Sequence, residues 1–232
     1  MILLDTDLTS EADYQHFLLP HGLRFYVNRI AYSNPMTPER LAAMQPDLTR
    51  CARQLVPGLE LNAVLYGCTS ATLVMGVDNV VQALRSAHPQ AALITPPTAA
   101  ALGLRALGVQ RITILAPYSR ETSAYIGDFF VAQGYTVERL AYLDLDDDRD
   151  VARLPLADVL TAARATLTPQ TEALFISCTA LPVAQSIPTL EAALGVPVLS
   201  SNLACAWEVL RRCGQSGGPG AGRLLQLPLP NP

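Results

Sequence analysis

The sequence repeats one short pattern at nearly half its length. Residues 62–70 read NAVLYGCTS and residues 172–180 read EALFISCTA, so an apolar run with strand propensity ends in Cys-Thr both times. The two cysteines, Cys68 and Cys178, lie 178 − 68 = 110 residues apart in a chain of 232 residues. This spacing predicts two similar halves, each of which carries a cysteine at the end of a strand.

Strand-like segments alternate with helical patterns along the whole chain. The expected strands lie at residues 2–4, 24–30, 61–66, 91–94, 111–115, 136–140, 173–176 and 196–199. Such alternation predicts an α/β fold of two pseudo-symmetric domains with mostly parallel sheets flanked by helices, and an active site in the cleft between the domains. We expect a first domain at residues 1–93 plus 201–213, a second at 94–200, and a mobile C-terminal tail at 214–232.

The segment after Thr37 has the pattern of an amphipathic helix. Thr37 suits the N-cap position and Pro38 the first helical position, and apolar residues recur at helical spacing as far as Leu55. We expect one packing helix here, without a role in chemistry.

The basic residues are all arginines, and this composition excludes several classes of enzyme. Without lysine the chain cannot form the internal aldimine of a pyridoxal-phosphate enzyme, the Schiff base of an aldolase or a Walker-type phosphate loop. The formal net charge of −4 provides no basic field for nucleic acid or for an anionic membrane surface. We therefore expect neither as a partner.

The cysteines and histidines carry no disulfide or metal pattern. Five cysteines is an odd number, and the apolar start of the chain is broken by Asp5, so it is no signal peptide; we expect reduced thiols in the cytoplasm. His16, His21 and His88 have no metal-ligand spacing, and no Cys-x-x-Cys occurs, so no metal is expected. The remaining cysteines are interpreted as packing or surface residues: Cys51, Cys205 and Cys213.

Each Cys-Thr pair is expected at the carboxyl end of a parallel strand, where ligands of such sheets bind. The segments that begin with Thr69 and Thr179 are expected to start helices, whose free N–H groups bind carboxylates and lower the pKa of a nearby thiol. One buried cysteine is ordinarily a packing residue. Two in matched contexts favour a pair of catalytic thiols facing a small carboxylate.

Five segments carry a family resemblance. They are YGCTSAT at residues 66–72, APY at 116–118, VAR at 151–153, FISCT at 175–179 and VLSSNLA at 198–204. With them the chain resembles the aspartate/glutamate racemase superfamily, in the branch of maleate cis-trans isomerase, arylmalonate decarboxylase and the ectoine-utilisation racemase-like proteins.

The resemblance implies a cofactor-independent isomerase, a homo-oligomer, with its active site between two α/β domains. It implies that Cys68 and Cys178 are catalytic and that Tyr118 contacts the substrate, and it assigns a carboxylate cradle to Thr69, Ser70 and Thr179. Arylmalonate decarboxylases have only the second of the two cysteines, so Cys68 argues against that activity.

Two acidic residues depart from the maleate isomerase pattern. Asp7 and Asp148 stand where those enzymes have substrate-contacting asparagines, and buried carboxylates repel a dianion and attract an ammonium group. We therefore favour a racemase or epimerase of an amino acid or diaminobutyrate derivative, as in ectoine utilisation. The alternatives are maleate isomerisation, arylmalonate-type decarboxylation and a non-catalytic small-molecule binding protein. Asp7 also suits a helix N-terminal cap that contacts no ligand.

Overall fold

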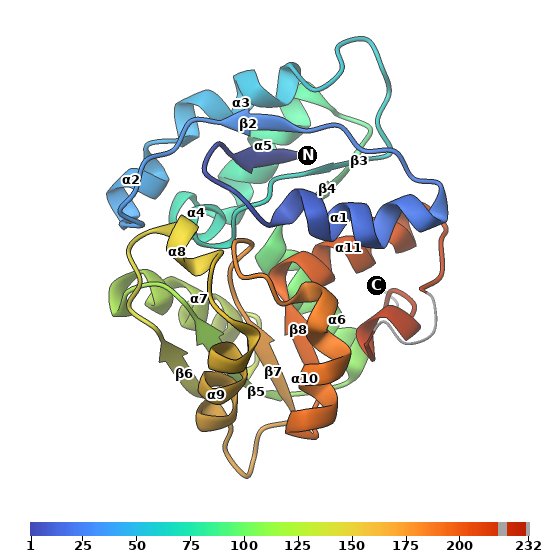
Figure 1. Ribbon diagram of the computed structural model, residues 1–232. Coiled ribbons are helices and arrows are strands. Elements are labelled where there is room, and N and C mark those ends of the chain that lie inside the picture. Colours follow the sequence, from blue (N-terminus) through green and yellow to red (C-terminus); the bar gives the residue numbers. More distant parts are fainter. Residues whose placement is uncertain (218–221, 231–232) are drawn as a thin grey trace.

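The structure is a computed structural model that describes residues 1–217 and 222–230. Its first half alternates short strands with helices, starting at the N-terminus (Figure 1). These elements are β1 (Ile2–Leu4), α1 (Ser10–Leu18), the 3-10 helix η1 (Leu19–His21), β2 (Asn28–Ile30), α2 (Pro38–Ala42), α3 (Gln45–Arg53), β3 (Ala63–Leu65), α4 (Thr69–Met75), α5 (Val77–Ala87) and β4 (Ala92–Ile94).

The second half follows the same alternation with longer strands. Its elements are α6 (Pro96–Leu107), β5 (Arg111–Ala116), α7 (Arg120–Ala132), β6 (Thr136–Tyr142), α8 (Asp148–Val151), α9 (Leu156–Thr166), β7 (Ala173–Ile176), η2 (Ala184–Ser186), α10 (Ile187–Leu194), β8 (Val198–Ser200), α11 (Ser201–Arg212) and η3 (Leu224–Gln226).

The two halves order their strands in the same way. In the first, β1 pairs with β2 and β3 pairs with β4, all parallel, and a bridge between Ile2 and Tyr66 sets β1 beside β3. In the second, the parallel sheet has the order β6-β5-β7-β8. Each half therefore runs second, first, third, fourth strand, and Figure 1 shows the two groups one above the other with helices around them. The predicted α/β fold with parallel sheets flanked by helices is confirmed.

Two expected elements differ in extent. Of residues 24–30 only β2 is a strand, because its partner β1 begins at Ile2, which pairs with Asn28, and residues 24–27 have no strand beside them. The helix expected from Pro38 to Leu55 is two helices, α2 and α3. Pro46, the second residue of α3, has no N–H to continue the α2 hydrogen-bond series.

Helix α11 is the packing element shared by both halves. It contacts α1 and β3 of the first half and α6 and β8 of the second, and most of its residues are buried. The domain division at residues 93/94 and 200/201 stays a prediction. No helix in the described part of the chain is long and apolar enough to cross a lipid bilayer.

The described part of the C-terminal segment differs from the expected mobile tail. Leu224 and Leu225 are buried, and the Arg211 guanidinium donates to the carbonyl oxygens of Leu225 at 2.5 Å and Leu227 at 2.7 Å. The Trp207 indole N–H donates to the same Leu227 oxygen at 2.9 Å. The described residues 222–230 are therefore held against α11 by hydrogen bonds and buried side chains. Residues 218–221 and 231–232 lie outside the described residues.

Candidate active site

Both cysteines of the repeat line one pocket. The pocket is small and nearly closed, and each of the two cysteines is only 5 % exposed. Its wall comes from both halves of the chain and consists of Leu4, Asp7, Tyr32, Met36, Leu41, Cys68, Ser70, Tyr118, Asp148, Cys178, Thr179 and Ala180. The pocket lies where several parallel strands end, which is the usual ligand position in such sheets.

Cys68 is the N-cap residue of α4. Its carbonyl oxygen accepts the first helical hydrogen bond, from Thr72 N–H at 3.2 Å, and a second one from the Thr72 hydroxyl at 2.6 Å. The thiol accepts from the Ala71 N–H group and lies 3.7 Å from the Ser70 hydroxyl. The helix expected after the first Cys-Thr pair is confirmed.

Cys178 is followed by a turn, so the helix expected at Thr179 is wrong; the first helical residues come later, at η2. The fourth residue after Cys178 is Pro182, which has no N–H to donate to the Cys178 carbonyl oxygen as Thr72 does in the first repeat. Cys178 instead adopts φ = 108°, a strained value for a residue other than glycine. Its N–H donates to the Ser201 hydroxyl oxygen at 3.1 Å, and its thiol accepts from Ala180 N–H at 3.3 Å.

Hydrogen bonds through two side-chain hydroxyls link the two thiols. The Tyr118 hydroxyl donates to the Cys178 thiol and accepts from the Ser70 hydroxyl, which in turn lies next to Cys68. Tyr118 and Ser70, both expected in the site, are therefore on the pocket wall and between the two sulfur atoms.

Burial dominates the electrostatics of both thiols. It raises the pKa of Cys68 to about 11 and that of Cys178 to about 12, and the hydrogen bonds from Ala71 and Ser70, and from Tyr118 and Ala180, only partly oppose this rise. The sequence-based expectation of a lowered thiol pKa is therefore wrong for the ligand-free chain. The free-energy cost of removing the thiolate from water exceeds the stabilisation that the surrounding hydrogen-bond donors provide.

The threonines of the two Cys-Thr pairs hold the halves together. The Thr69 hydroxyl bonds the Ser201 hydroxyl at 2.8 Å, and the Thr179 hydroxyl donates to the Gly67 carbonyl oxygen at 3.1 Å. Thr69 is absent from the pocket wall, whereas Thr179 lies on it. Both hydroxyls are occupied within the protein, so a part in the carboxylate cradle stays a prediction for these two residues.

Asp7 is on the pocket wall but makes the contacts of a turn residue at the start of α1. Its Oδ1 accepts from the N–H groups of Thr9 at 2.9 Å and Ser10 at 2.8 Å, and its Oδ2 accepts from the Ser10 hydroxyl at 2.7 Å. Burial raises the pKa of Asp7, and these hydrogen bonds oppose the rise. This geometry favours the capping alternative for Asp7, although the side chain remains part of the wall.

Asp148, the first residue of α8, is the second carboxylate of the wall and is 4 % exposed. One oxygen accepts from the Asn34 amide at 2.8 Å and the other from the Thr6 hydroxyl. Each oxygen keeps a lone pair for a further donor. Asn34 and Thr6 belong to loops without a motif, and no sequence signal pointed to them.

The wall contains no lysine, arginine or histidine side chain. The ionisable carboxyl groups of the wall, those of Asp7 and Asp148, therefore have no basic side chain beside them on the wall. In the described part of the chain, no three His, Cys, Asp or Glu residues gather in a way that could hold a metal ion.

Two parallel-sheet halves around a two-thiol pocket define an isomerase-type enzyme of the aspartate/glutamate racemase superfamily, as the comparisons support. The family model described as arylmalonate decarboxylase matches residues 20–225, and the chain belongs to this family. The predicted superfamily branch is confirmed.

A maleate isomerase matches nearly the whole chain, and an arylmalonate decarboxylase matches about half of it. The maleate isomerase of Nocardia farcinica is 29 % identical over 97 % of this chain and 94 % of its own length. The arylmalonate decarboxylase of Bordetella bronchiseptica is 32 % identical over 56 % of each chain. Among solved structures, a cysteine-to-serine mutant of the Nocardia farcinica maleate cis-trans isomerase with a covalently bound succinylcysteine intermediate has a TM-score of 0.88, with 29 % identity over 97 % of this chain and 96 % of that one.

Proposed function

We propose that the chain is a cofactor-independent racemase or epimerase of a small carboxylate that carries an ammonium group, such as an amino acid or a diaminobutyrate derivative. One observation carries this proposal. The pocket is lined by two thiols and by two acidic side chains, Asp7 and Asp148, and its wall has no basic side chain.

In the proposed reaction the two thiols exchange roles in every turnover. The thiolate of one cysteine takes the α-proton and becomes a thiol, while the other thiol gives its proton to the opposite face of the α-carbon and becomes a thiolate. The Ser70 and Tyr118 hydroxyls are suited to stabilise the charge that develops on the substrate carboxylate. Ser70 and Tyr118 lie between the cysteines, so a substrate held there has a thiol available on each side.

The charge of the wall favours a zwitterion over a dianion. Two unit charges 4 Å apart at an effective dielectric constant of 20 interact by about 4 kcal/mol, enough to change affinity strongly. A second substrate carboxylate would meet Asp148 without a cation on the wall, whereas an ammonium group would donate to its free lone pairs. The diaminobutyrate class adds a second nitrogen of this kind.

Maleate cis-trans isomerisation is the second candidate, and the comparisons favour it. Maleate isomerases match this chain over nearly its full length, and one was solved with a succinylcysteine intermediate. In that reaction one thiolate adds to a carbon of the double bond, and the other thiol protonates the neighbouring carbon. Rotation about the new single bond follows, then loss of the proton and of the thiolate, which gives fumarate.

Turnover in deuterated water separates the two candidates. The panel contains maleate, aspartate, glutamate, 2,4-diaminobutyrate and its N-acetyl derivatives, analysed by NMR and chiral chromatography. The proposal expects solvent deuterium on the α-carbon together with loss of enantiomeric purity in an amino-acid compound. Fumarate formation with no change in any amino acid would contradict the racemase proposal and favour maleate isomerisation. Stoichiometric binding without turnover would favour a binding protein.

Asp148→Asn tests the charge argument directly. Loss of the carboxylate should lower turnover of an ammonium-bearing substrate about tenfold or more and should strengthen binding of maleate. Asp158→Asn, a substitution on the exposed surface of α9, is the matched control and should change neither. Equal kinetics for Asp148→Asn and the wild type would remove Asp148 from the substrate site.

A further inference from the structure

Three buried side-chain oxygens have no hydrogen-bond partner among the described residues: those of Tyr32, Thr113 and Ser177. Thr113 lies within β5, and Ser177 follows β7; neither lines the pocket. Tyr32 alone of the three is on the wall, together with both cysteines. Its hydroxyl is thus an unpaired polar group that belongs to a wall residue of the pocket.

The loop after β2 holds Tyr32 in place. The Tyr32 N–H group donates to the Asp5 carboxylate at 3.1 Å. Two residues further on, the Asn34 amide donates to Asp147 at 2.9 Å and Asp148 at 2.8 Å, and Met36 N–H donates to the Asp146 carbonyl oxygen at 2.9 Å. The loop is therefore fixed to both halves of the chain, and the phenol ring, 9 % exposed, is buried in the wall.

We propose that Tyr32 is a further substrate-binding residue, whose hydroxyl donates a hydrogen bond to an oxygen atom of the carboxylate substrate. A buried hydroxyl without a partner is unfavourable, and a ligand acceptor would remove that penalty. The inference rests on the proposed function only in taking this pocket as the substrate site; it holds equally for a racemase and for a maleate isomerase.

The chemistry of the hydroxyl fits a donor. Burial, then the nearby Cys68, Asp148 and Cys178, raise the pKa of Tyr32 far above its usual range, so the group stays protonated at any working pH. Tyr118 differs, because its hydroxyl is already bonded to Cys178 and Ser70. In the ligand-free chain the Tyr118 hydroxyl therefore already has partners within the protein, whereas the Tyr32 hydroxyl has none among the described residues.

Tyr32→Phe tests the inference, because it removes the hydroxyl and keeps the ring. The probe is the panel compound that the wild type binds most tightly by isothermal titration calorimetry, measured on the Cys68→Ser background, in which turnover is strongly slowed. We expect its Kd to rise by about 10-fold or more, as for a lost hydrogen bond to a charged group. The melting temperature of the ligand-free chain should stay equal or rise, because no internal hydrogen bond is lost.

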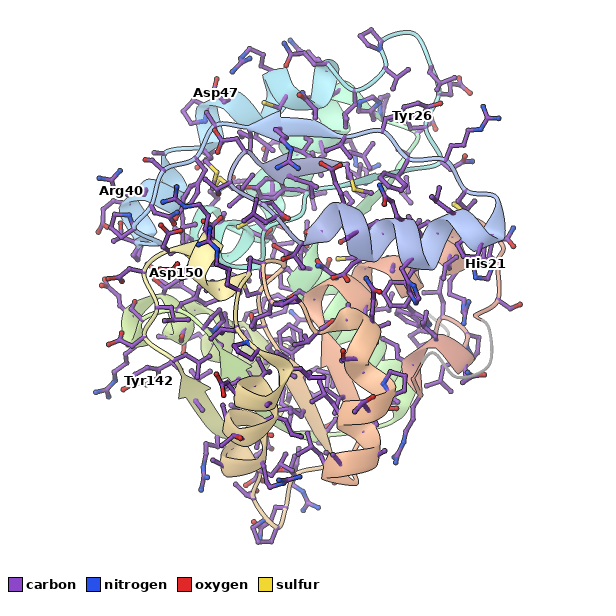
Figure 2. All side chains as sticks on the ribbon, in the orientation of Figure 1. His21, Tyr26, Arg40, Asp47, Tyr142 and Asp150 are labelled. Atoms are coloured by element: carbon purple, nitrogen blue, oxygen red, sulfur yellow. The ribbon has the colours of Figure 1, made fainter. Side chains whose placement is uncertain are left out.

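Two matched variants make the result specific. Tyr135→Phe removes a buried hydroxyl that donates to the Ala101 carbonyl oxygen at 2.9 Å, so it should lower the melting temperature and leave Kd unchanged. Tyr26→Phe alters an exposed ring, visible on the outside of the molecule in Figure 2, and should change neither quantity.

The outcomes separate this inference from the proposed function. An unchanged Kd for Tyr32→Phe, or a loss of stability equal to that of Tyr135→Phe, overturns the role of Tyr32 and leaves the two-thiol reaction intact. Full activity of both cysteine variants overturns the reaction, whatever Tyr32 does. If no panel compound binds the wild type, both fall together.

Discussion

The two Cys-Thr turns share a sequence pattern but differ in structure. After Cys68 the chain enters α4 at once, and the Cys68 carbonyl oxygen receives the Thr72 N–H group. After Cys178 the corresponding position is Pro182, no helix starts, and the cysteine adopts φ = 108°. A repeated strand end therefore brings each cysteine to the same pocket, although the backbone that follows the two cysteines differs.

This difference gives the thiols unlike surroundings. Cys68 has the Ala71 N–H group and the Ser70 hydroxyl beside it, whereas Cys178 has the Ala180 N–H group and the Tyr118 hydroxyl. The backbone of Cys178 is also fixed by Ser201. In a two-thiol reaction the two faces of the substrate thus meet chemically distinct partners.

Replacing either thiol should have the largest effect. Cys68→Ser and Cys178→Ser should each lower kcat about 1000-fold, because each removes one of the two proton-transfer groups. A racemase with one remaining thiol should still exchange the α-proton of one enantiomer, and the two variants should favour opposite enantiomers in deuterium exchange monitored by NMR. Cys213→Ser, a partly exposed position, is the control and should be neutral. Wild-type rates in both cysteine variants would contradict the two-thiol reaction.

The pH profile should show the next largest effect. Both thiols are protonated near pH 7 in the ligand-free chain, with pKa values of about 11 and 12, and the reaction needs one thiolate. We expect kcat/KM to rise about tenfold per pH unit between pH 7 and 9. A plateau reached below pH 8 would mean that the ligand-free pocket stabilises a thiolate.

The same raised pKa values set the sign of the stability change. A thiol that holds its proton more tightly when folded stabilises the native state fully below its unfolded pKa of about 8.5, and loses this contribution as pH rises through the folded values. The melting temperature should therefore fall as the pH rises above 9. This fall should be smaller in a Cys68→Ala, Cys178→Ala double variant.

Ser201→Ala should have an intermediate effect, because it disturbs both turns through one hydroxyl. Cys178 N–H and the Thr69 hydroxyl would lose their partner, at a cost of about 1–3 kcal/mol of unfolding free energy. We expect kcat to fall about tenfold with little change in KM, measured together with chemical denaturation. Ser86→Ala, which removes an exposed hydroxyl bonded to the Ala83 carbonyl oxygen, is the control. Unchanged kcat and stability would show that the Cys178 conformation needs no such support.

Pro182→Ala should have the smallest effect and sharpens the comparison most. It restores the N–H group that Thr72 has in the first repeat, yet the contacts of Cys178, Thr179 and Ala180 keep the turn in place. The unfolding free energy should fall by less than about 1 kcal/mol, because alanine gives the unfolded chain more conformational freedom than proline does. The activity should stay within about threefold of the wild-type value. A large loss of activity would mean that the proline itself maintains the turn.

Much of the fold followed from local sequence patterns. The strands before Cys68 and Cys178 are apolar and rich in residues with strand propensity, and their end positions in a parallel sheet place both cysteines on one pocket wall. Tyr118, which only the family resemblance implied, lies on the same wall, as does Ser70. Thr37 caps its helix as predicted by its position before Pro38. These features depend on a few adjacent residues, so the sequence carries them directly.

The features that sequence could not reveal depend on distant contacts. Tyr32 and Asn34 belong to a loop that no periodicity marks. Ser201 lies in a segment that carries the family resemblance, but its contacts with Cys178 and Thr69 depend on the fold. The raised thiol pKa values come from burial by residues of both halves, while the helix-end pattern alone suggests the opposite sign. The fastening of residues 222–230 likewise depends on Arg211 and Trp207 of α11, which lie well before them in the sequence.

The hydrogen bonds between residues 34–36 and 146–148 have a kinetic consequence. The two sulfur atoms are nearly enclosed, and these hydrogen bonds join the two halves of the chain beside the pocket, so we expect part of the wall to move when a substrate enters. Admission of substrate and release of product are then steps with their own barriers, separate from proton transfer. Solvent viscosity and temperature would act on these steps even in an enzyme whose chemistry is fast.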